Sequence, residues 1–159
     1  MNAGQLADLI DGHAAALVLF ARQWCTAPED VVQDTFCKLA AQSAPPNDVV
    51  AWLYRVVRNA ALDAGRADRR RARREAAAAR PVRWFAEREI DGLDVAAAVA
   101  ALEGLPADQR EAIVGRLWGG MTLEQVAAVA GCSVSSAHRR FEAGIAALRE
   151  RLGVRCLKT

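Results

Sequence analysis

A short apolar helix pattern, a glycine and a longer amphipathic pattern follow one another between Thr122 and Leu148. Thr122 stands where an N-cap is expected and Gln125 follows three residues later, which predicts a capping box. Gly131 falls between the two patterns, where a glycine adopts a positive φ at little cost. Five apolar residues then recur at the spacing of one helix face: Val134, Ala137, Phe141, Ile145 and Leu148. The segment 122–148 is therefore predicted to be a helix-turn-helix.

The polar face of the second predicted helix carries side chains that suit nucleic acid. Its candidate DNA-contacting residues are Ser135, Ser136, His138, Arg139 and Arg140. Hydroxyl, imidazole and guanidinium groups hydrogen-bond to base edges and phosphates, and arginine binds both guanine and phosphate well. Two alternatives stay open: the segment is an ordinary helical hairpin with a solvated polar face, or the imidazole is an ordinary surface group.

The rest of the chain also favours helices, so the expected fold class is all-α, with two small helical domains. Apolar residues of the first block recur at three- and four-residue intervals between 6 and 20. A second helix is expected from Pro28, because proline suits a first helical turn and acidic residues follow it. The paired prolines in 43–48 interrupt the pattern, and a third helix is expected over 49–65, running on to about residue 78.

The second block is predicted to contribute two helices before the helix-turn-helix. One covers about 95–105, and the next begins at Ala107 or Asp108 and stops at Gly119. Four residues of this second helix are expected to be its apolar positions: Ile113, Val114, Leu117 and Trp118.

Charge is distributed unevenly along the chain, although the net charge is only +2. Arginines concentrate at 66–74 (RADRRRARR), which overlaps the start of a segment, 67–92, that is expected to be a flexible basic linker. Two domains joined by such a linker can contact separated sites. Residues 93–153 contain six basic and seven acidic residues. Because phosphate neutralisation supplies much of the affinity for DNA, this domain is expected to need a partner that holds it on DNA.

Several classes of protein are disfavoured by what the sequence lacks. The cysteines stand far apart, without a CxxC pair, so we expect buried reduced thiols and no metal site: Cys25, Cys37, Cys132 and Cys156. His13 and His138 lie in different blocks and there is no glycine-rich phosphate loop, so neither an enzyme nor a cofactor is expected. No basic leader precedes an apolar run, and no stretch has the roughly 20 apolar residues of a membrane span. A soluble, cytoplasmic protein without membrane contact is expected.

Both blocks resemble the bacterial RNA polymerase sigma factors of the extracytoplasmic-function group, over residues 5–66 and 93–153. PEDVVQDTFCKLA (28–40) resembles the segment that docks on core RNA polymerase, which implies a polymerase contact by Glu29, Asp30, Gln33 and Asp34. AWLYRVVRNAALDAGR (51–66) resembles the helix that engages the −10 promoter element. That likeness implies −10 contacts by the preceding loop 43–48 and by Trp52, Arg55, Arg58 and Asn59. An aromatic on a core helix is more often structural, so a core role for Trp52 also stays open.

The second block is similar to the family domain that reads the −35 element, with LPADQREAIVGRLWGGMTLEQVA (105–127) matching its start. Many members continue the recognition helix with His-Arg-Ala-Arg, which supplies further phosphate contacts. This chain has Glu142-Ala143-Gly144-Ile145 there, and Glu142 partly reverses the polarity of that half of the helix. The expected organisation is a region 2-like domain over 1–66, the linker 67–92, a region 4-like domain over 93–153 and a tail 154–159.

The resemblance implies a transcription initiation factor that binds core RNA polymerase, directs it to promoter DNA and assists −10 opening. It also implies that this factor catalyses nothing itself and that an anti-sigma factor is a possible further partner. Two readings from the residues stay open beside it: a free-standing helix-turn-helix regulator, and a protein-interaction module without a nucleic-acid role. The 66–74 cluster either lies along the promoter or polymerase, or is a solvated linker.

Overall fold

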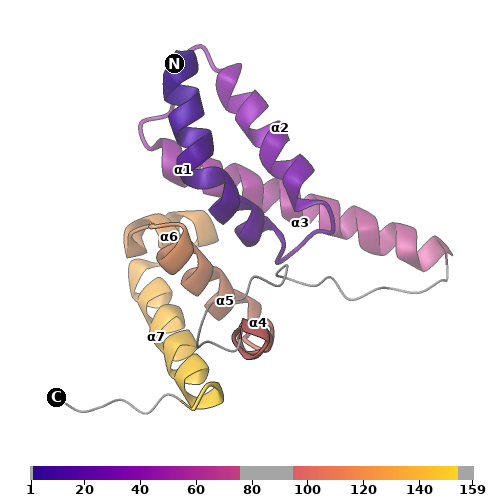
Figure 1. The fold of residues 1–159 in the computed structure, drawn as a ribbon, viewed down its shortest axis with the longest axis vertical. Coiled ribbons are helices and arrows are strands. Elements are labelled where there is room, and N and C mark those ends of the chain that lie inside the picture. The colour runs from indigo at the N-terminus through magenta and orange to yellow at the C-terminus, as the bar shows by residue number, and fades with distance from the viewer. Residues whose placement is uncertain (1, 76–94, 154–159) are drawn as a thin grey trace.

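The computed structural model describes residues 2–75 and 95–153, and within these ranges its regular secondary structure is entirely helical (Figure 1). The first block contributes α1 (Ala3–Ala21), α2 (Pro28–Ala40) and α3 (Val49–Glu75). The second contributes α4 (Val95–Glu103), α5 (Ala107–Ile113), the π-helix η1 (Val114–Trp118), α6 (Leu123–Ala130) and α7 (Val134–Arg151). The predicted all-α, two-domain organisation is confirmed. Residues 76–92 of the predicted linker, the tail 154–159 and Cys156 lie outside the described residues.

Local capping explains where the helices of the first block begin. The Asn2 side chain accepts a hydrogen bond from the Gln5 amide at 2.8 Å, and the Gln5 side chain returns one to the Asn2 amide. This capping box satisfies two amides that have no partner inside the helix. Pro28 occupies the first turn of α2, followed by Glu29 and Asp30, as predicted. The third helix continues past residue 65, as predicted, and α3 is described to Glu75.

The helix before the helix-turn-helix departs from the predicted pattern. It changes at Val114 into a π-helix, in which the Gly119 amide donates to the Val114 carbonyl at 3.1 Å. A π-turn holds more residues than an α-turn, so the positions that follow rotate relative to the α-helical pattern. The prediction that Leu117 and Trp118 are core positions is wrong: they are 55% and 45% exposed, and the next buried apolar side chain is that of Met121.

Two further expectations about burial are corrected by the structure. Val134 was expected to face the core with four other residues of its helix, but it is 43% exposed because it stands in the first turn of α7, directly after the cap. Of the cysteines expected to be buried thiols, Cys25 is buried, Cys132 is half-buried and Cys37 is exposed on α2. The exposed thiol of Cys37 lines the groove between α1 and α2.

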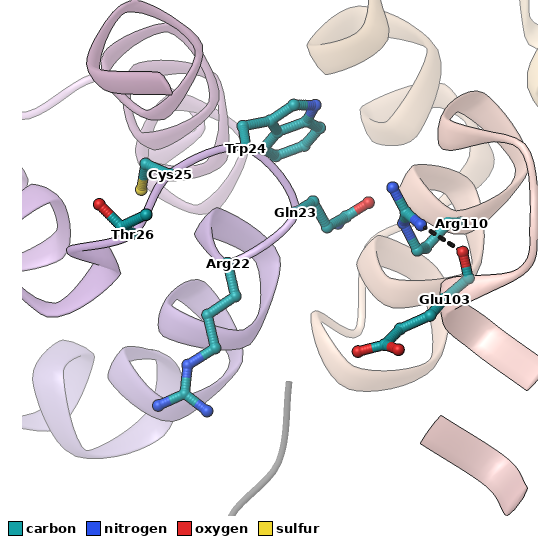
Figure 2. A pocket seen from close by; sticks show the side chains of 7 residues that line it. All are labelled: Arg22, Gln23, Trp24, Cys25, Thr26, Glu103 and Arg110. Carbon is teal, nitrogen blue, oxygen red and sulfur yellow. Dashed lines mark hydrogen bonds between the residues drawn. The ribbon is translucent and has the colours of Figure 1, made fainter. Parts of the chain in front are cut away.

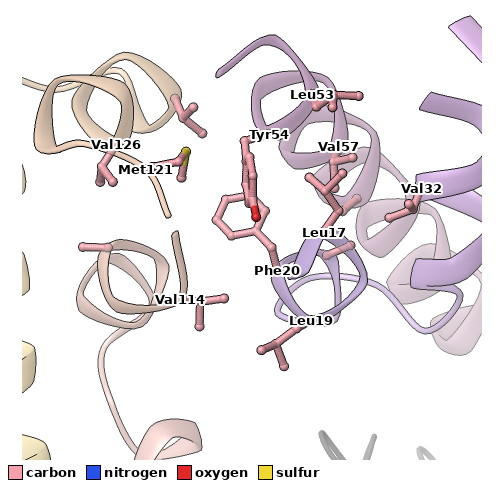
Figure 3. Packing of buried hydrophobic residues seen from close by; sticks show 14 of the residues in the cluster. Leu17, Leu19, Phe20, Val32, Leu53, Tyr54, Val57, Val114, Met121 and Val126 are labelled. Atoms are coloured by element: carbon pink, nitrogen blue, oxygen red, sulfur yellow. The ribbon is translucent and has the colours of Figure 1, made fainter. Parts of the chain in front are cut away.

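The two blocks share one apolar core instead of standing apart. Phe20 of α1 packs edge-on against Tyr54 of α3, with ring centroids 5.0 Å apart. Val114 and Met121 of the second block belong to the same cluster of buried side chains (Figure 3). A smaller cluster built on Leu102, Leu105 and Ile113 joins α4 and α5 to α7. In this structure, therefore, α1 and α3 of the first block lie directly against η1 and α6 of the second.

Candidate nucleic-acid interface

The predicted helix-turn-helix is present with the caps that the sequence indicated. The Gln125 amide donates to Thr122 Oγ1 at 3.2 Å, and the Thr122 amide donates to Gln125 Oε1 at 2.8 Å. Gly131 ends α6 in the left-handed region, with φ +67°. Ser133 then caps α7, because its Oγ accepts from the Ser136 amide at 3.2 Å. These contacts fix the angle at which α7 leaves the turn.

The five candidate residues on α7 differ in how freely they face solvent. Ser135, His138 and Arg139 are exposed, so they are available to a base edge or a phosphate. Ser136 is half-buried and part of the cap, and its Oγ lies 2.9 Å from Ser133 Oγ. Arg139 Nη2 donates to Ser136 Oγ at 3.4 Å, which orients an otherwise exposed guanidinium.

Arg140 and His138 have acidic neighbours of their own. Arg140 Nε lies 3.2 Å from Asp108 Oδ2 of α5, so this arginine links the recognition helix to the domain core. His138 Nε2 lies 4.0 Å from Glu142 Oε1, one turn further along α7. The outward surface of α7 is therefore formed mainly by Ser135, His138 and Arg139.

The four candidate residues for the −10 element all lie on α3, but in different surroundings. Arg55 and Asn59 are exposed, whereas Trp52 is half-buried and packs against the main core. The Arg58 guanidinium binds the Glu111 carboxylate of α5 twice: Nε to Oε1 at 2.6 Å and Nη2 to Oε2 at 3.3 Å. Its Cζ also lies 5.9 Å from the centre of the Trp24 ring.

Two contacts of this face were not found from the sequence: Arg58 with Glu111, and Asp48 with Gln125. Glu111 is a charged residue within a short helix, and the sequence gives no signal that its side chain is only 7% exposed. Asp48 caps α3 through its Oδ1, which accepts from the Ala51 amide at 2.9 Å, and its Oδ2 accepts from Gln125 Nε2 at 2.9 Å. These hydrogen bonds, led by the one from Gln125, hold the pKa of Asp48 below its ordinary value. The position of Asp48 just before α3 is a local sequence signal for a helix cap. Its hydrogen bond to Gln125 joins distant parts of the chain and leaves no such signal.

The candidate polymerase-binding residues form an exposed acidic face on α2. Glu29, Asp30, Gln33 and Asp34 are all exposed, while Val32 and Phe36 of the same helix are buried. Arg22 Nη2 lies 2.8 Å from Glu29 Oε1, and this hydrogen bond lowers the pKa of Glu29.

Beside this acidic face runs a groove of about 380 Å³ between α1 and α2. Its floor is apolar, with Leu6, Ile10 and Phe36 among its lining residues. Glu29 and Gln33 also line the groove.

A second hollow, of about 370 Å³, lies where the turn between α1 and α2 meets α4 and α5 (Figure 2). Gln23 points across it toward Arg110, whose Nη1 donates to the Glu103 carbonyl oxygen at 2.9 Å. Neither amide atom of the Gln23 side chain finds a hydrogen-bond partner in the described part of the chain, although both are buried. Cys25 also lines this hollow, and burial raises the pKa of its thiol.

Neither a metal-binding cluster nor a membrane-spanning helix is found in the described ranges. Among residues 2–75 and 95–153, no group of three or more His, Cys, Asp or Glu side chains is arranged to hold a metal ion. None of the helices in those ranges is long and apolar enough to cross a membrane.

A helical domain with an acidic face, joined to a helix-turn-helix domain, defines a class of two-domain DNA-binding protein, and family comparisons identify which one. Residues 9–71 match the family model of sigma-70 region 2, and residues 96–148 match that of sigma-70 region 4. A curated relative, the probable RNA polymerase sigma factor RfaY of Xanthomonas campestris pv. campestris, is 28% identical over 159 residues. That match covers 94% of this chain but only 40% of the relative's length.

Solved structures agree with this assignment. The sigma factor RpoE of Bartonella quintana, solved with the anti-sigma factor NepR, has a TM-score of 0.70 at 28% identity, covering 94% of this chain and 97% of that one. CnrH, solved with the cytosolic domain of CnrY, has a TM-score of 0.63 at 27% identity, covering 98% and 92%. The chain belongs to the sigma-70 family, as a sigma factor of the extracytoplasmic-function group.

Proposed function

We propose that this protein binds core RNA polymerase, directs it to specific promoters and assists opening of the −10 region. The observation that carries the proposal is that one chain pairs an exposed acidic α2 with an exposed recognition helix, on two domains matched by sigma-70 regions 2 and 4. In this role the chain contributes recognition, and polymerase performs the chemistry. Its place of action is then the cytoplasm, where polymerase and promoter DNA are found.

The proposed polymerase contact is the face of α2 formed by Glu29, Asp30, Gln33 and Asp34. Carboxylates at the border of an apolar groove suit a helical partner that presents apolar side chains flanked by basic ones. In the Arg22–Glu29 pair Arg22 is half-buried and Glu29 is exposed. The energy of such a partly exposed pair is small, so a basic group of polymerase can replace Arg22 at little cost. The four residues are therefore accessible in the structure as it stands.

The proposed −35 contacts are made by α7, with Ser135, His138 and Arg139 on its outer face. Ser136 and Arg140 are proposed to act mainly by holding this face in place, with contacts to phosphate as a secondary role. The proposed −10 contacts come from Arg55, Arg58 and Asn59 of α3 and from the loop 43–48. Trp52, half-buried against the core, is proposed to support α3 and to offer its exposed edge to a base.

An anti-sigma partner is proposed as the means of restraint, because RpoE of Bartonella quintana was solved in complex with one. The domain organisation proposed for these roles remains 1–66 for polymerase and −10 binding, 67–92 as linker, 93–153 for −35 binding and 154–159 as tail. The described α3 continues across the first of these boundaries to Glu75.

Association with polymerase separates this function from that of a free-standing regulator. We expect the purified chain to elute with core RNA polymerase in size-exclusion chromatography. The double variant Asp30→Lys/Gln33→Ala should elute apart from it, while Lys38→Ala, on the same helix, should behave as wild type. A wild-type chain that binds promoter DNA alone and never elutes with core enzyme would instead identify a free-standing regulator.

A further inference from the structure

The third helix continues past the other helices of the first block, and its continuation is rich in arginine. Residues 66–71 contain four arginines and one aspartate. This segment, the basic extension, is part of α3 and runs on beyond α1 and α2 in Figure 1. Its arginines at 66, 69, 70 and 71 are all exposed. The extension is therefore a helical, positively charged surface to which the function proposed above gives no role.

One face of α3 carries exposed polar side chains from the candidate −10 residues into the basic extension. This row consists of Arg55, Asn59, Arg66 and Arg70, all of them exposed. At 3.6 residues per turn, the four positions lie within about 60° of one another around the helix axis. With a rise of about 1.5 Å per residue, the row is roughly 22 Å long. One strand of duplex DNA has a phosphate about every 3.4 Å along its axis, so the row spans about six of them.

The arginines of this row are accessible to a phosphate. Arg66 Nη1 lies 2.9 Å from Asp63 Oδ1 on the preceding turn, and the two side chains are 62% and 74% exposed. An ion pair this exposed contributes little energy, so a phosphate can replace the Asp63 carboxylate at little cost. Arg70 stands one turn further along the helix and is exposed as well. Guanidinium groups bind phosphate through two parallel N–H donors, so both side chains suit this ligand.

The direction of the basic extension is fixed by a contact with the turn between α1 and α2, which Figure 2 shows with Trp24 and Thr26. Thr26 Oγ1 donates to Asp68 Oδ2 at 2.7 Å, across 42 positions of the chain. Less than one turn earlier on α3, Gly65 packs against the same turn so closely that a Cβ atom there would overlap the Trp24 carbonyl oxygen. Glycine, which has no Cβ, permits this approach. We call the three residues Thr26, Gly65 and Asp68 the joint.

We propose that the joint aims the basic extension so that Arg66 and Arg70 bind phosphates of the double-stranded DNA adjoining the −10 element. This inference rests on the −10 role proposed above for α3. Arg55 and Asn59 then face the opened strand, and the two arginines continue the same row onto the duplex. The residues of the joint are positioning residues, because they hold the helix against the turn and do not touch DNA. This role also accounts for an acid within the extension: Asp68 opposes phosphate by its charge but holds the helix in line.

The test uses the full chain bound to core RNA polymerase and two fluorescein-labelled DNAs of random sequence. One is a 12-nucleotide single strand, and the other is the same strand continued by 12 base pairs of duplex. Fluorescence anisotropy measures the affinity of the complex for each DNA over a series of salt concentrations. Core enzyme contributes its own DNA binding, so each variant is compared with a control of the same net charge. An unchanged affinity for the single strand shows that a variant is folded.

Arg66→Ala/Arg70→Ala tests the two arginines of the extension. Its control, Arg71→Ala/Arg149→Ala, removes the same charge from two exposed positions outside the row. Each arginine that no longer neutralises a duplex phosphate makes the slope of log affinity against log salt concentration shallower by about 0.9. We therefore expect the slope on the duplex-containing DNA to become shallower by about 1.8 in the first variant. The control should keep the wild-type slope.

Asp68→Ala and Asp68→Asn test the joint, because both remove the same charge. Asparagine keeps a side-chain oxygen that can accept from Thr26, whereas alanine has none. Alanine is also the better helix former, so weaker binding by Asp68→Ala cannot come from a less stable helix. We expect Asp68→Ala to bind the duplex-containing DNA about fivefold more weakly than Asp68→Asn, as the loss of one hydrogen bond allows. Thr26→Val should show the same loss relative to Thr26→Ser, without any change of charge.

Equal salt slopes for Arg66→Ala/Arg70→Ala and its control overturn the duplex contact, and equal affinities within the Asp68 and Thr26 pairs overturn the joint. If the arginine variant instead no longer elutes with core polymerase, the extension binds an acidic polymerase surface and the assignment to DNA is wrong. Elution of the wild-type chain with core polymerase tests the proposed function separately. When that elution is seen, equal variants and controls reject this inference alone; when it is absent, the proposed function fails and the inference fails with it.

Discussion

Single side chains on α7 have separable roles, although the sequence shows them as one polar cluster. Arg139 is exposed and held toward the outer face by Ser136, whereas Arg140 is half-buried and paired with Asp108. Of these two adjacent arginines, Arg139 is therefore expected to contact DNA, and Arg140 is expected to support the fold. Their spacing alone did not distinguish them, because the partner of Arg140 lies on another helix.

Arg139→Ala is expected to weaken promoter recognition without affecting stability. Loss of one arginine that contacts a base pair costs about 1–3 kcal/mol of discrimination, so transcription from a cognate promoter should fall about tenfold at limiting protein. Arg140→Ala should instead lower the unfolding free energy by up to about 1 kcal/mol, as expected for a partly exposed pair. Transcription at a series of protein concentrations measures the first effect, and thermal unfolding measures the second. Asp108→Asn should reproduce the loss of stability but not the loss of transcription. If Arg139→Ala and Arg140→Ala lost transcription equally and neither changed the stability, these separate roles of the two arginines would be contradicted.

Tyr54→Phe is expected to stabilise the protein, which is unusual for a change at a fully buried residue. The hydroxyl is buried against Gly119 without a partner in the described ranges, and its burial raises the pKa of the phenol strongly. Removing it relieves a desolvation cost of about 1 kcal/mol while the ring stays in place. Thermal unfolding should show a higher midpoint than wild type, and a lower one would mean that the hydroxyl has a partner.

Among the elements, the helix-turn-helix was predictable because each of its boundaries is set locally. Thr122 and Gln125 form the capping box within four residues, and Gly131 supplies the positive φ at the turn. The π-helix before it was not predictable, since its hydrogen bonds depart from the period on which the pattern rests. Leu117 and Trp118 consequently point outward, although they continue the apolar spacing of α5.

Gly131 allows a direct test of that local control. No atom would lie within 4 Å of a Cβ added there, so a substitution meets only the cost of the left-handed conformation. Gly131→Ala should lower the unfolding free energy by about 1 kcal/mol, and Gly131→Asn by less, because asparagine tolerates this region better. Urea denaturation measures both. Equal stability of wild type and Gly131→Ala would show that the turn relaxes into another conformation.

At the scale of the whole molecule, the two domains and their types followed from the sequence, but their contact did not. Glu111 looks like an ordinary acid on an amphipathic helix, and its partner Arg58 lies 53 positions away. The apolar residues that join the domains, such as Met121 and Tyr54, also fit the core of a single domain. Only the folded structure brings α3 against the domain that contains the recognition helix, and it pairs Arg58 of α3 with Glu111 of that domain.

The hydrogen bond between Gln125 and Asp48, which links the domains, also predicts that the unfolding free energy depends on pH. The pKa of Asp48 is lowered in the folded protein. The carboxylate therefore makes its full contribution to the unfolding free energy at a pH above the ordinary pKa of about 3.9, and this contribution is lost as the pH falls through the lower pKa of the folded state. The difference in unfolding free energy between wild type and Asp48→Asn should therefore narrow on acidification below about pH 4. Urea denaturation over a pH series measures it, with Asp11→Asn, an exposed acid on α1, as the control. A difference that stays constant would exclude this role for the carboxylate.

The proposed role of this chain is to give core RNA polymerase the ability to choose promoters. Its most direct test is transcription of genomic DNA from the source organism by purified core enzyme, with and without the chain, followed by sequencing of the RNA 5′ ends. We expect new start sites that appear only with the chain and share one −35 and one −10 sequence upstream. The same start sites with and without the chain would contradict it.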